Sequence, residues 1–165
     1  MKRFILFLDF DGVLCTSRQA YAVGDRGLLG CLDPVSLDFL DRLCREYKIW
    51  VIVSSTWRIG ERAEMFINMF KATGHFDLAK SLFYDDYATR SMNGRQVRGL
   101  EIEDWMKRHD DLVLDYLIID DDCDMLDYQM SRLVNTPTRD GMLLEHYVHI
   151  EKVIENAFAV DNDDW

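Results

Sequence analysis

Two carboxylates, Asp9 and Asp11, directly follow the apolar run of residues 4–8 and precede Gly12. Five apolar residues bounded by turn signals predict a buried strand of a parallel sheet, so both acids stand where that strand ends. In open α/β sheets, ligands bind in the crevice beyond the carboxyl ends of the strands. Because two unpaired acids are costly there, a metal ion, a phosphoryl group or both is the expected partner.

Two further apolar runs end in polar clusters. Ser54–Ser55 follows residues 49–53, and Asp120–Asp121 follows residues 116–119. Parallel strands end at the same edge of a sheet, so we expect these clusters to meet the two acids of the first run. Carboxylates hold Mg²⁺, and hydroxyls with free backbone N–H groups receive phosphate oxygens. The pattern predicts phosphoryl transfer, in which one carboxylate attacks phosphorus and a neighbouring acid moves the protons.

Helical patterns separate these strands and predict how the polar ends are held together. Asp33 followed by Pro34 indicates a helix start, and an apolar stripe continues to Tyr47. Further helices are expected at 61–73, 100–108, near 125–131 and 144–158, short strands at 81–84 and 133–135, and a loop or small hairpin at 13–32. Alternating strands and helices predict an α/β fold, a three-layer Rossmann-like parallel sheet with helices on both faces.

The composition predicts one folded domain. Of the 165 residues, 48% are hydrophobic, and no repeat or linker divides the chain. The expected domain covers residues 1–160, and residues 161–165 form an acidic, frayed tail. A net charge of −11 argues against nonspecific coating of nucleic acid. Residues 54–98 nevertheless carry seven basic against five acidic side chains, which favours either a local anion-binding face or a solvated helix surface.

The cysteines and the first apolar run bear on the compartment. The four cysteines have no metal-ligand spacing and predict free, buried or partly buried thiols in a reducing compartment: Cys15, Cys31, Cys44 and Cys123. Asp9 and Asp11 cut the first apolar run well short of a signal-peptide core or a membrane span. We therefore expect a cytoplasmic protein without a membrane partner.

The three motifs, in this order, resemble those of the haloacid dehalogenase (HAD) superfamily of phosphatases. The similar segments are Asp9-Phe10-Asp11-Gly12-Val13 for the first motif, residues 51–54 for the second and residues 118–121 for the acidic fourth. More narrowly, residues 54–58, 98–102 and 119–125 resemble the small HAD domain of phage and bacterial RNA-repair proteins.

This resemblance implies roles for the matching residues. Asp9 would be the nucleophile and a Mg²⁺ ligand, and Asp11 the general acid and base, with its backbone carbonyl also on the ion. Ser54, with Ser55 beside it, would bind the phosphoryl group. Asp120 is the expected further metal carboxylate, ahead of its neighbours Asp121 and Asp122.

The third motif departs from the superfamily, which usually places a lysine there. Arg98 is the expected replacement and Arg95 its rival, because arginine binds phosphate bidentately and keeps its proton. An ordinary surface arginine is the alternative for Arg98. Behind the hydroxyls, Trp57 and Arg58 could stack a base and hold a neighbouring phosphate. Alternatively, Trp57 packs the start of a helix and Arg58 pairs with an acid such as Glu61.

The spacing of the motifs bears on the substrate. Ordinary elements already occupy much of the 45 residues from Asp9 to Ser54 and of the 44 from Ser54 to Arg98, which leaves no room for a large cap domain. An open site favours the terminal phosphate of a polynucleotide, or a phosphoprotein, over a free sugar phosphate.

We therefore expect a Mg²⁺-dependent phosphomonoesterase that works through an aspartyl-phosphate, with a polynucleotide 3′-phosphatase of nucleic-acid repair as the sharpest hypothesis. The alternatives are a small-nucleotide phosphatase and a noncatalytic, partner-binding HAD-like module. Whether RNA- or DNA-repair enzymes act as partners, and which oligomeric state the chain adopts, stay open.

Overall fold

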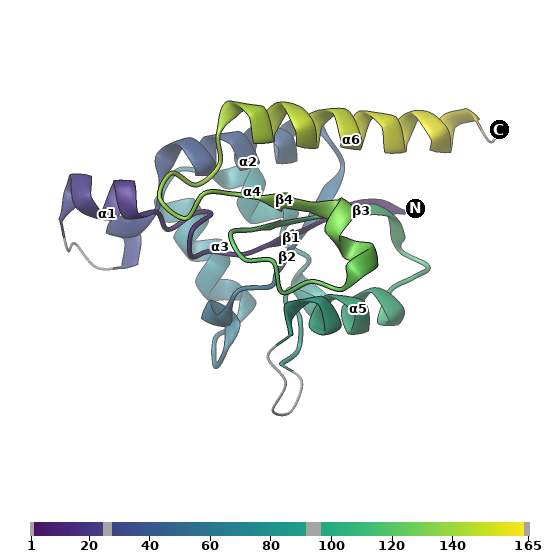
Figure 1. Cartoon of the computed structure of the whole chain (residues 1–165), viewed down its shortest axis with the longest axis horizontal. Coiled ribbons are helices and arrows are strands. Elements are labelled where there is room, and N and C mark those ends of the chain that lie inside the picture. Colours follow the sequence, from purple (N-terminus) through teal and green to yellow (C-terminus); the bar gives the residue numbers. More distant parts are fainter. Residues whose placement is uncertain (1, 25–27, 92–96, 164–165) are drawn as a thin grey trace.

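The computed structural model describes residues 2–24, 28–91 and 97–163. Its centre is a four-stranded parallel sheet with the strand order β2-β1-β3-β4. The strands are β1 (Arg3–Leu8), β2 (Ile49–Val53), β3 (Val113–Asp120) and β4 (Leu133–Asn135). Each strand lies where an apolar run predicts one, and the predicted Rossmann-like parallel sheet is confirmed (Figure 1).

Helices cover both faces of this sheet. The covering helices are α2 (Pro34–Glu46), α3 (Ala63–Ala72), α4 (Phe76–Ser81), α5 (Arg98–Arg108) and α6 (Leu144–Asp163), whereas α1 (Ser17–Val23) lies apart from the core. Successive side chains of a strand face opposite sides. Phe4 and Leu6 of β1 are therefore buried with α2, α3, α4 and α6, whereas Ile5 and Phe7 are buried with α5. In Figure 1, α2 and α6 lie on one side of the strands and α5 on the other.

The helix starts and ends follow from local sequence where a cap is present. The Asp33 side chain accepts hydrogen bonds from the backbone N–H groups of Val35 and Ser36, and Pro34 opens α2 as predicted. At the other end of the chain, α6 continues to Asp163, into the segment predicted to be a frayed tail. No helix among the described residues is long and apolar enough to cross a membrane.

The described part of residues 13–32, which leaves out 25–27, is not the loop or hairpin that the sequence predicts. It contains α1, whose N-terminus is capped by the Thr16 side chain, and a short 3-10 helix at Leu28–Cys31. Helix α1 buries none of its residues, so it has no apolar stripe that periodicity could reveal.

Two shorter predictions are also corrected. The strand expected at 81–84 is absent: α4 ends at Ser81, Leu82 makes a single bridge with Val51, and a 3-10 helix follows at Tyr84–Asp86. The start of α4 is capped by Asp41 of α2, whose side chain accepts the N–H groups of Asp77 and Leu78. The helix expected near 125–131 is a 3-10 helix at Asp127–Arg132.

The prediction of four free thiols is wrong for one pair. Cys15 and Cys31 form a disulfide, because a bridge between Cys15 and Leu32 folds this segment back and leaves the two Cα atoms 4.9 Å apart. Cys44 is a buried free thiol, and burial raises its pKa to about 12. Cys123 is free and exposed.

Candidate active site

The register of the sheet brings the three polar strand ends together. Leu8, at the end of β1, is in register with the last residue of β2 and with Ile119 of β3. The next residues along, Asp9, Ser54 and Asp120, therefore stand side by side. The ladder continues through them, since the Asp9 N–H donates to the Ile119 carbonyl at 3.0 Å and the Ser54 N–H to the Leu8 carbonyl at 2.9 Å.

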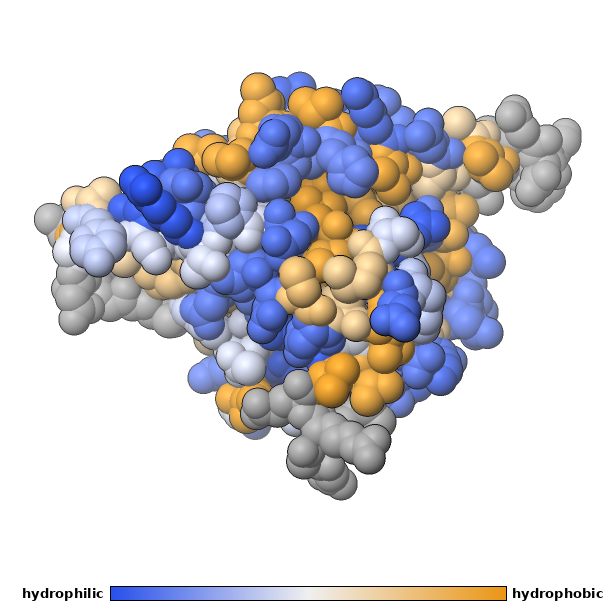
Figure 2. Space-filling model, in the orientation of Figure 1, coloured by the Kyte–Doolittle hydropathy of each residue, from blue (hydrophilic) through white to orange (hydrophobic). Residues whose placement is uncertain are grey.

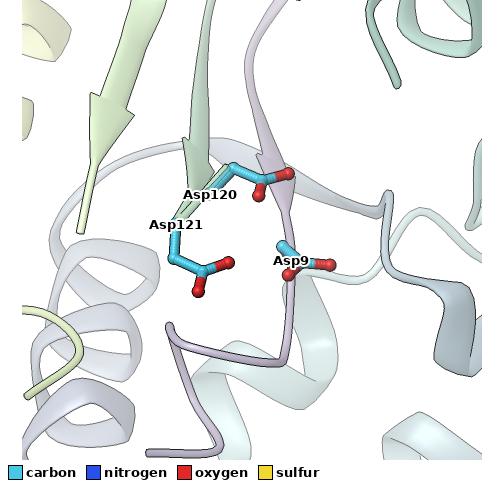
Figure 3. Close-up of side chains that lie close together, drawn as sticks. All are labelled: Asp9, Asp120 and Asp121. Atoms are coloured by element: carbon cyan, nitrogen blue, oxygen red, sulfur yellow. The ribbon is translucent and has the colours of Figure 1, made fainter. Parts of the chain in front are cut away.

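Three carboxylates converge beyond these strand ends. Asp9, Asp120 and Asp121 each offer an oxygen within 4.8 Å of the others, and Figure 3 shows all three side chains in the space past β1 and β3. Gly12 allows this approach: it has a φ of 71°, and a Cβ there would lie 2.1 Å from an Asp121 carboxylate oxygen. Asp11 is exposed, and its side chain lies outside this group of acids.

The surroundings of Asp120 disfavour the negative charge of its carboxylate. Asp120 is fully buried, and its Oδ1 accepts the Asp122 N–H at 3.0 Å. Its Oδ2 accepts no hydrogen bond among the described residues, and the nearest cation is the Arg98 Nε at 3.5 Å. Burial, followed by the charge of Asp9, raises the pKa of Asp120 to about 7. Burial also raises the pKa of Asp9, against the opposing effect of Arg98.

These observations fit a divalent cation. Three hard oxygen ligands lie close together, and one of them is an orphaned, buried carboxylate oxygen whose negative charge burial disfavours. The positive charge of a bound Mg²⁺ would offset both causes of the raised pKa, because it favours the ionised form of each carboxylate that it contacts.

Arg98 is the cation that reaches this cluster. Its Nη1 lies 3.1 Å from Asp9 Oδ1, and it also donates to the Ser54 carbonyl. Helix α5 begins at Arg98, where the Asp124 side chain accepts the Arg98 N–H at 3.1 Å and fixes the helix start against the loop after β3. With a side chain only 14% exposed, Arg98 is not an ordinary surface arginine. Its predicted rival, Arg95, lies outside the described residues.

The two serines after β2 have different surroundings. Ser54 is fully buried, and its hydroxyl has no hydrogen-bond partner among the described residues. The Ser55 hydroxyl hydrogen-bonds Asp9, which opposes the rise of the Asp9 pKa, and it accepts the Trp57 N–H at 3.4 Å. A buried hydroxyl without a partner is costly, so Ser54 is the serine of the two that a bound phosphoryl oxygen would satisfy.

Arg58 lies beneath the site rather than at its surface. It is 7% exposed, and its Nη1 donates to the carbonyls of Ser54 and Ser55 at 2.8 and 2.5 Å. Its Nε donates to the Thr89 carbonyl at 2.7 Å, and its Nη2 contacts Glu101 at 2.6 Å. These bonds hold the backbone of Ser54 and Ser55 against α5 and against the backbone at Thr89.

The acid predicted to pair with Arg58 is corrected. The partner is Glu101 of α5, not Glu61, and both side chains of the pair are at least nine-tenths buried. The sequence carries a signal for this pair: Glu101 stands one residue before buried Ile102 and four before buried Trp105, so it belongs to the apolar stripe of its helix. A carboxylate in such a stripe needs a buried partner.

Trp57 contacts the second aspartate of the first motif. Its indole Nε1–H donates to Asp11 Oδ2 at 3.0 Å. The ring is half-buried and packs against the fully buried Phe10 ring, with centroids 5.1 Å apart. The ring thus packs on Phe10, whereas the sequence suggests packing on the start of a helix, and it makes a polar contact that the sequence does not predict.

Two of the hollows on the described surface differ in their place relative to the sheet. A polar cleft of about 240 Å³ opens beside Arg98, and its lining includes the Arg58–Glu101 pair as well as Thr56, Ile59, Ser91, Asp122 and Asp124. A larger, more apolar groove of about 450 Å³ runs between α6 and the start of β3. Figure 2 shows hydrophobic and hydrophilic residues interspersed along α6. Of these two, the polar cleft is the one lined by Arg98, which contacts Asp9 and Asp120, so it is the one that adjoins the candidate site.

The fold and the site together define the class. A Rossmann-like sheet that carries Asp-Phe-Asp-Gly after β1, a serine after β2 and an acidic pair after β3 has the architecture of a HAD-superfamily domain. The family model described as the HAD domain in Swiss Army Knife RNA repair proteins matches residues 5–147. The chain belongs to this family. Searches of curated proteins and of solved structures found no match to the chain.

Proposed function

We propose that the protein is a Mg²⁺-dependent phosphomonoesterase that forms an aspartyl-phosphate on Asp9 and removes the 3′-phosphate from a polynucleotide end. One observation carries the proposal: Asp9, the orphaned oxygen of Asp120 and the Arg98 guanidinium meet at the carboxyl edge of the sheet. This arrangement places a nucleophile, a cation site and a phosphate-binding group within one short span.

The proposed reaction has two displacements. An Asp9 carboxylate oxygen attacks phosphorus, the bond from phosphorus to the ester oxygen breaks, and Asp11 gives its proton to that leaving oxygen. Water then attacks the same phosphorus, passes a proton to Asp11 and displaces the Asp9 carboxylate. The products are the alcohol and inorganic phosphate, and both aspartates return to their starting forms.

Other residues bind the ion and the phosphoryl group. Asp9, Asp120 and Asp121 would hold Mg²⁺, with the Asp11 backbone carbonyl as the further ligand implied by the family resemblance. The ion supplies positive charge that offsets charge on the carboxylates and on the transferring group. We assign the phosphoryl oxygens to Arg98, the Ser54 hydroxyl and neighbouring backbone N–H groups, with Ser55 holding Asp9.

The substrate proposal rests on access to the site and on the family. The described residues between β1 and α2 form only α1 and a 3-10 helix, so a bulky substrate can approach the strand ends. The family is described from RNA repair proteins, which favours a polynucleotide end. Arg58 is assigned a supporting role beneath the site, since its donors already bind carbonyls and Glu101.

A substrate panel tests this proposal. We expect Mg²⁺-dependent phosphate release from 3′-phosphorylated oligonucleotides, with kcat/KM at least about tenfold above that for 5′-phosphorylated oligonucleotides and free nucleotides, a difference of about 1.4 kcal/mol. Preference for free nucleotides would replace this substrate by the small-nucleotide alternative. No release from any ester, 4-nitrophenyl phosphate included, would indicate a noncatalytic module.

Mg²⁺ should stabilise the protein much more at pH 8 than at pH 5. The folded protein holds the Asp120 proton up to about pH 7, whereas the ordinary pKa is 3.8. The contribution of Asp120 to metal-free stability therefore falls as pH rises between these values, and ionised Asp120 becomes available to bind the cation.

The measurement is the rise in Tm on adding saturating Mg²⁺ at each pH, with Asp120→Asn as the comparison. The variant should show a small rise at both values. An equally large rise at pH 5 and pH 8 in the wild type would contradict the assignment of Asp120 as a ligand.

A further inference from the structure

We infer that Trp57 is a positioning residue, which orients the Asp11 carboxylate for proton transfer through its indole N–H. The inference rests on the proposed function and deepens it, because it gives the general acid and base a fixed geometry. It also joins the first motif, which carries Asp11, to the short segment that follows the serines of the second.

The Asp11 carboxylate lacks the buried surroundings of Asp9 and Asp120. The Asp11 side chain is exposed and lies outside the cluster of the three other acids. An exposed carboxylate without a fixed partner samples several rotamers, and freezing it costs conformational entropy. The hydrogen bond from Trp57 Nε1 to Asp11 Oδ2, at 3.0 Å, selects one arrangement and leaves Oδ1 to exchange a proton.

The indole donor of Trp57 is held in place by its neighbours. The Trp57 ring packs on Phe10, the residue between the two catalytic aspartates, and Phe10 is itself fully buried. Trp57 belongs to the 3-10 helix at Thr56–Arg58, which is capped by the Ser55 side chain. The next residue, Arg58, is fixed by its buried pair with Glu101. The indole is thus held from both sides.

Positioning of Asp11 and packing on Phe10 make different demands on the ring at position 57. Any flat apolar ring would satisfy the contact with Phe10, but only a donor at the ring edge satisfies Asp11. Trp57→Phe removes this donor and keeps an aromatic ring, which could still pack on Phe10 or stack on a base. Its effect should therefore depend on whether the reaction needs the Asp11 proton.

Two small esters that differ in this need provide the test. Benzyl phosphate expels a basic alkoxide that must be protonated, whereas 4-nitrophenyl phosphate expels a phenolate that leaves without a proton. We expect Trp57→Phe to lower kcat/KM for benzyl phosphate about tenfold, as for loss of one hydrogen bond to a charged group. For 4-nitrophenyl phosphate the loss should stay below about threefold. Asp11→Asn should show the same selectivity with a larger loss on benzyl phosphate.

Tyr47→Phe is the matched control, since it also removes one exposed donor, the hydroxyl that bonds Glu155 at 3.0 Å at the end of α2. It should change neither rate. Equal losses on both esters in Trp57→Phe, or no loss on either, would overturn the positioning role. A wild-type protein inactive on both esters would instead overturn the proposed function itself.

Discussion

Asp9→Asn should lower kcat by about 10⁴-fold or more while the protein remains folded, because an amide cannot attack phosphorus as a carboxylate does. Asp9 lies at the end of β1, and its backbone N–H continues the ladder with β3 whatever its side chain. Asparagine has nearly the same shape, and it removes a negative charge beside Asp120, whose pKa is raised in part by that charge. The sheet should therefore form normally.

The measurement is phosphate release under saturating Mg²⁺, together with far-UV circular dichroism and Tm. Asp111→Asn is the matched control, because it makes the same chemical change at an exposed position in the turn between α5 and β3. It should keep wild-type turnover. Substantial turnover by the Asp9→Asn variant would assign the nucleophile to another group.

Glu101→Gln should destabilise the fold by about 3 kcal/mol, because it leaves the buried Arg58 guanidinium without its counter-charge. The two side chains are 5% and 6% exposed and lie 2.6 Å apart. Burial, together with the charge of nearby Arg98, lowers the pKa of Arg58, and Glu101 is the main group that opposes this. Glutamine keeps the volume and an acceptor, so the loss isolates the charge.

Urea unfolding measures this loss, and Glu103→Gln on the same helix is the matched control. Glu103 makes an exposed pair with Lys107 at 2.9 Å, which water screens, so its replacement should cost much less. Equal losses in the two variants would mean that the Arg58–Glu101 pair is not a buried brace. A lowered kcat in Glu101→Gln is also expected, since Arg58 holds the carbonyls of both serines.

The sheet could be predicted because β1, β2 and the second half of β3 are almost completely buried on both faces. Such strands are written as uninterrupted apolar runs, and a polar residue after each run marks the strand end locally. The parallel register then brings Asp9, Ser54 and Asp120 together without further information. The start of α2 could also be predicted from local sequence, since Asp33 and Pro34 act within their own turn.

The features that could not be predicted depend on contacts between distant segments. Helix α4 is capped by Asp41, which is 36 residues before Asp77, so the local sequence carries no sign of this cap. Arg58 and Glu101 are 43 residues apart, and the Trp57 indole reaches back 46 residues to Asp11. The Cys15–Cys31 disulfide likewise depends on how its segment folds back.

The central claim is that Asp9 becomes phosphorylated during turnover, and borohydride trapping tests it most directly. The enzyme is quenched during turnover of a 3′-phosphorylated oligonucleotide with Mg²⁺, reduced with borohydride, digested and analysed by mass spectrometry. Reduction of an acyl phosphate converts the aspartate into homoserine. We predict homoserine at position 9, dependent on both Mg²⁺ and substrate. Homoserine at another position would contradict this claim. So would an unmodified Asp9 in an enzyme sample that turns over, provided that the same borohydride treatment traps a known acyl phosphate in a parallel control.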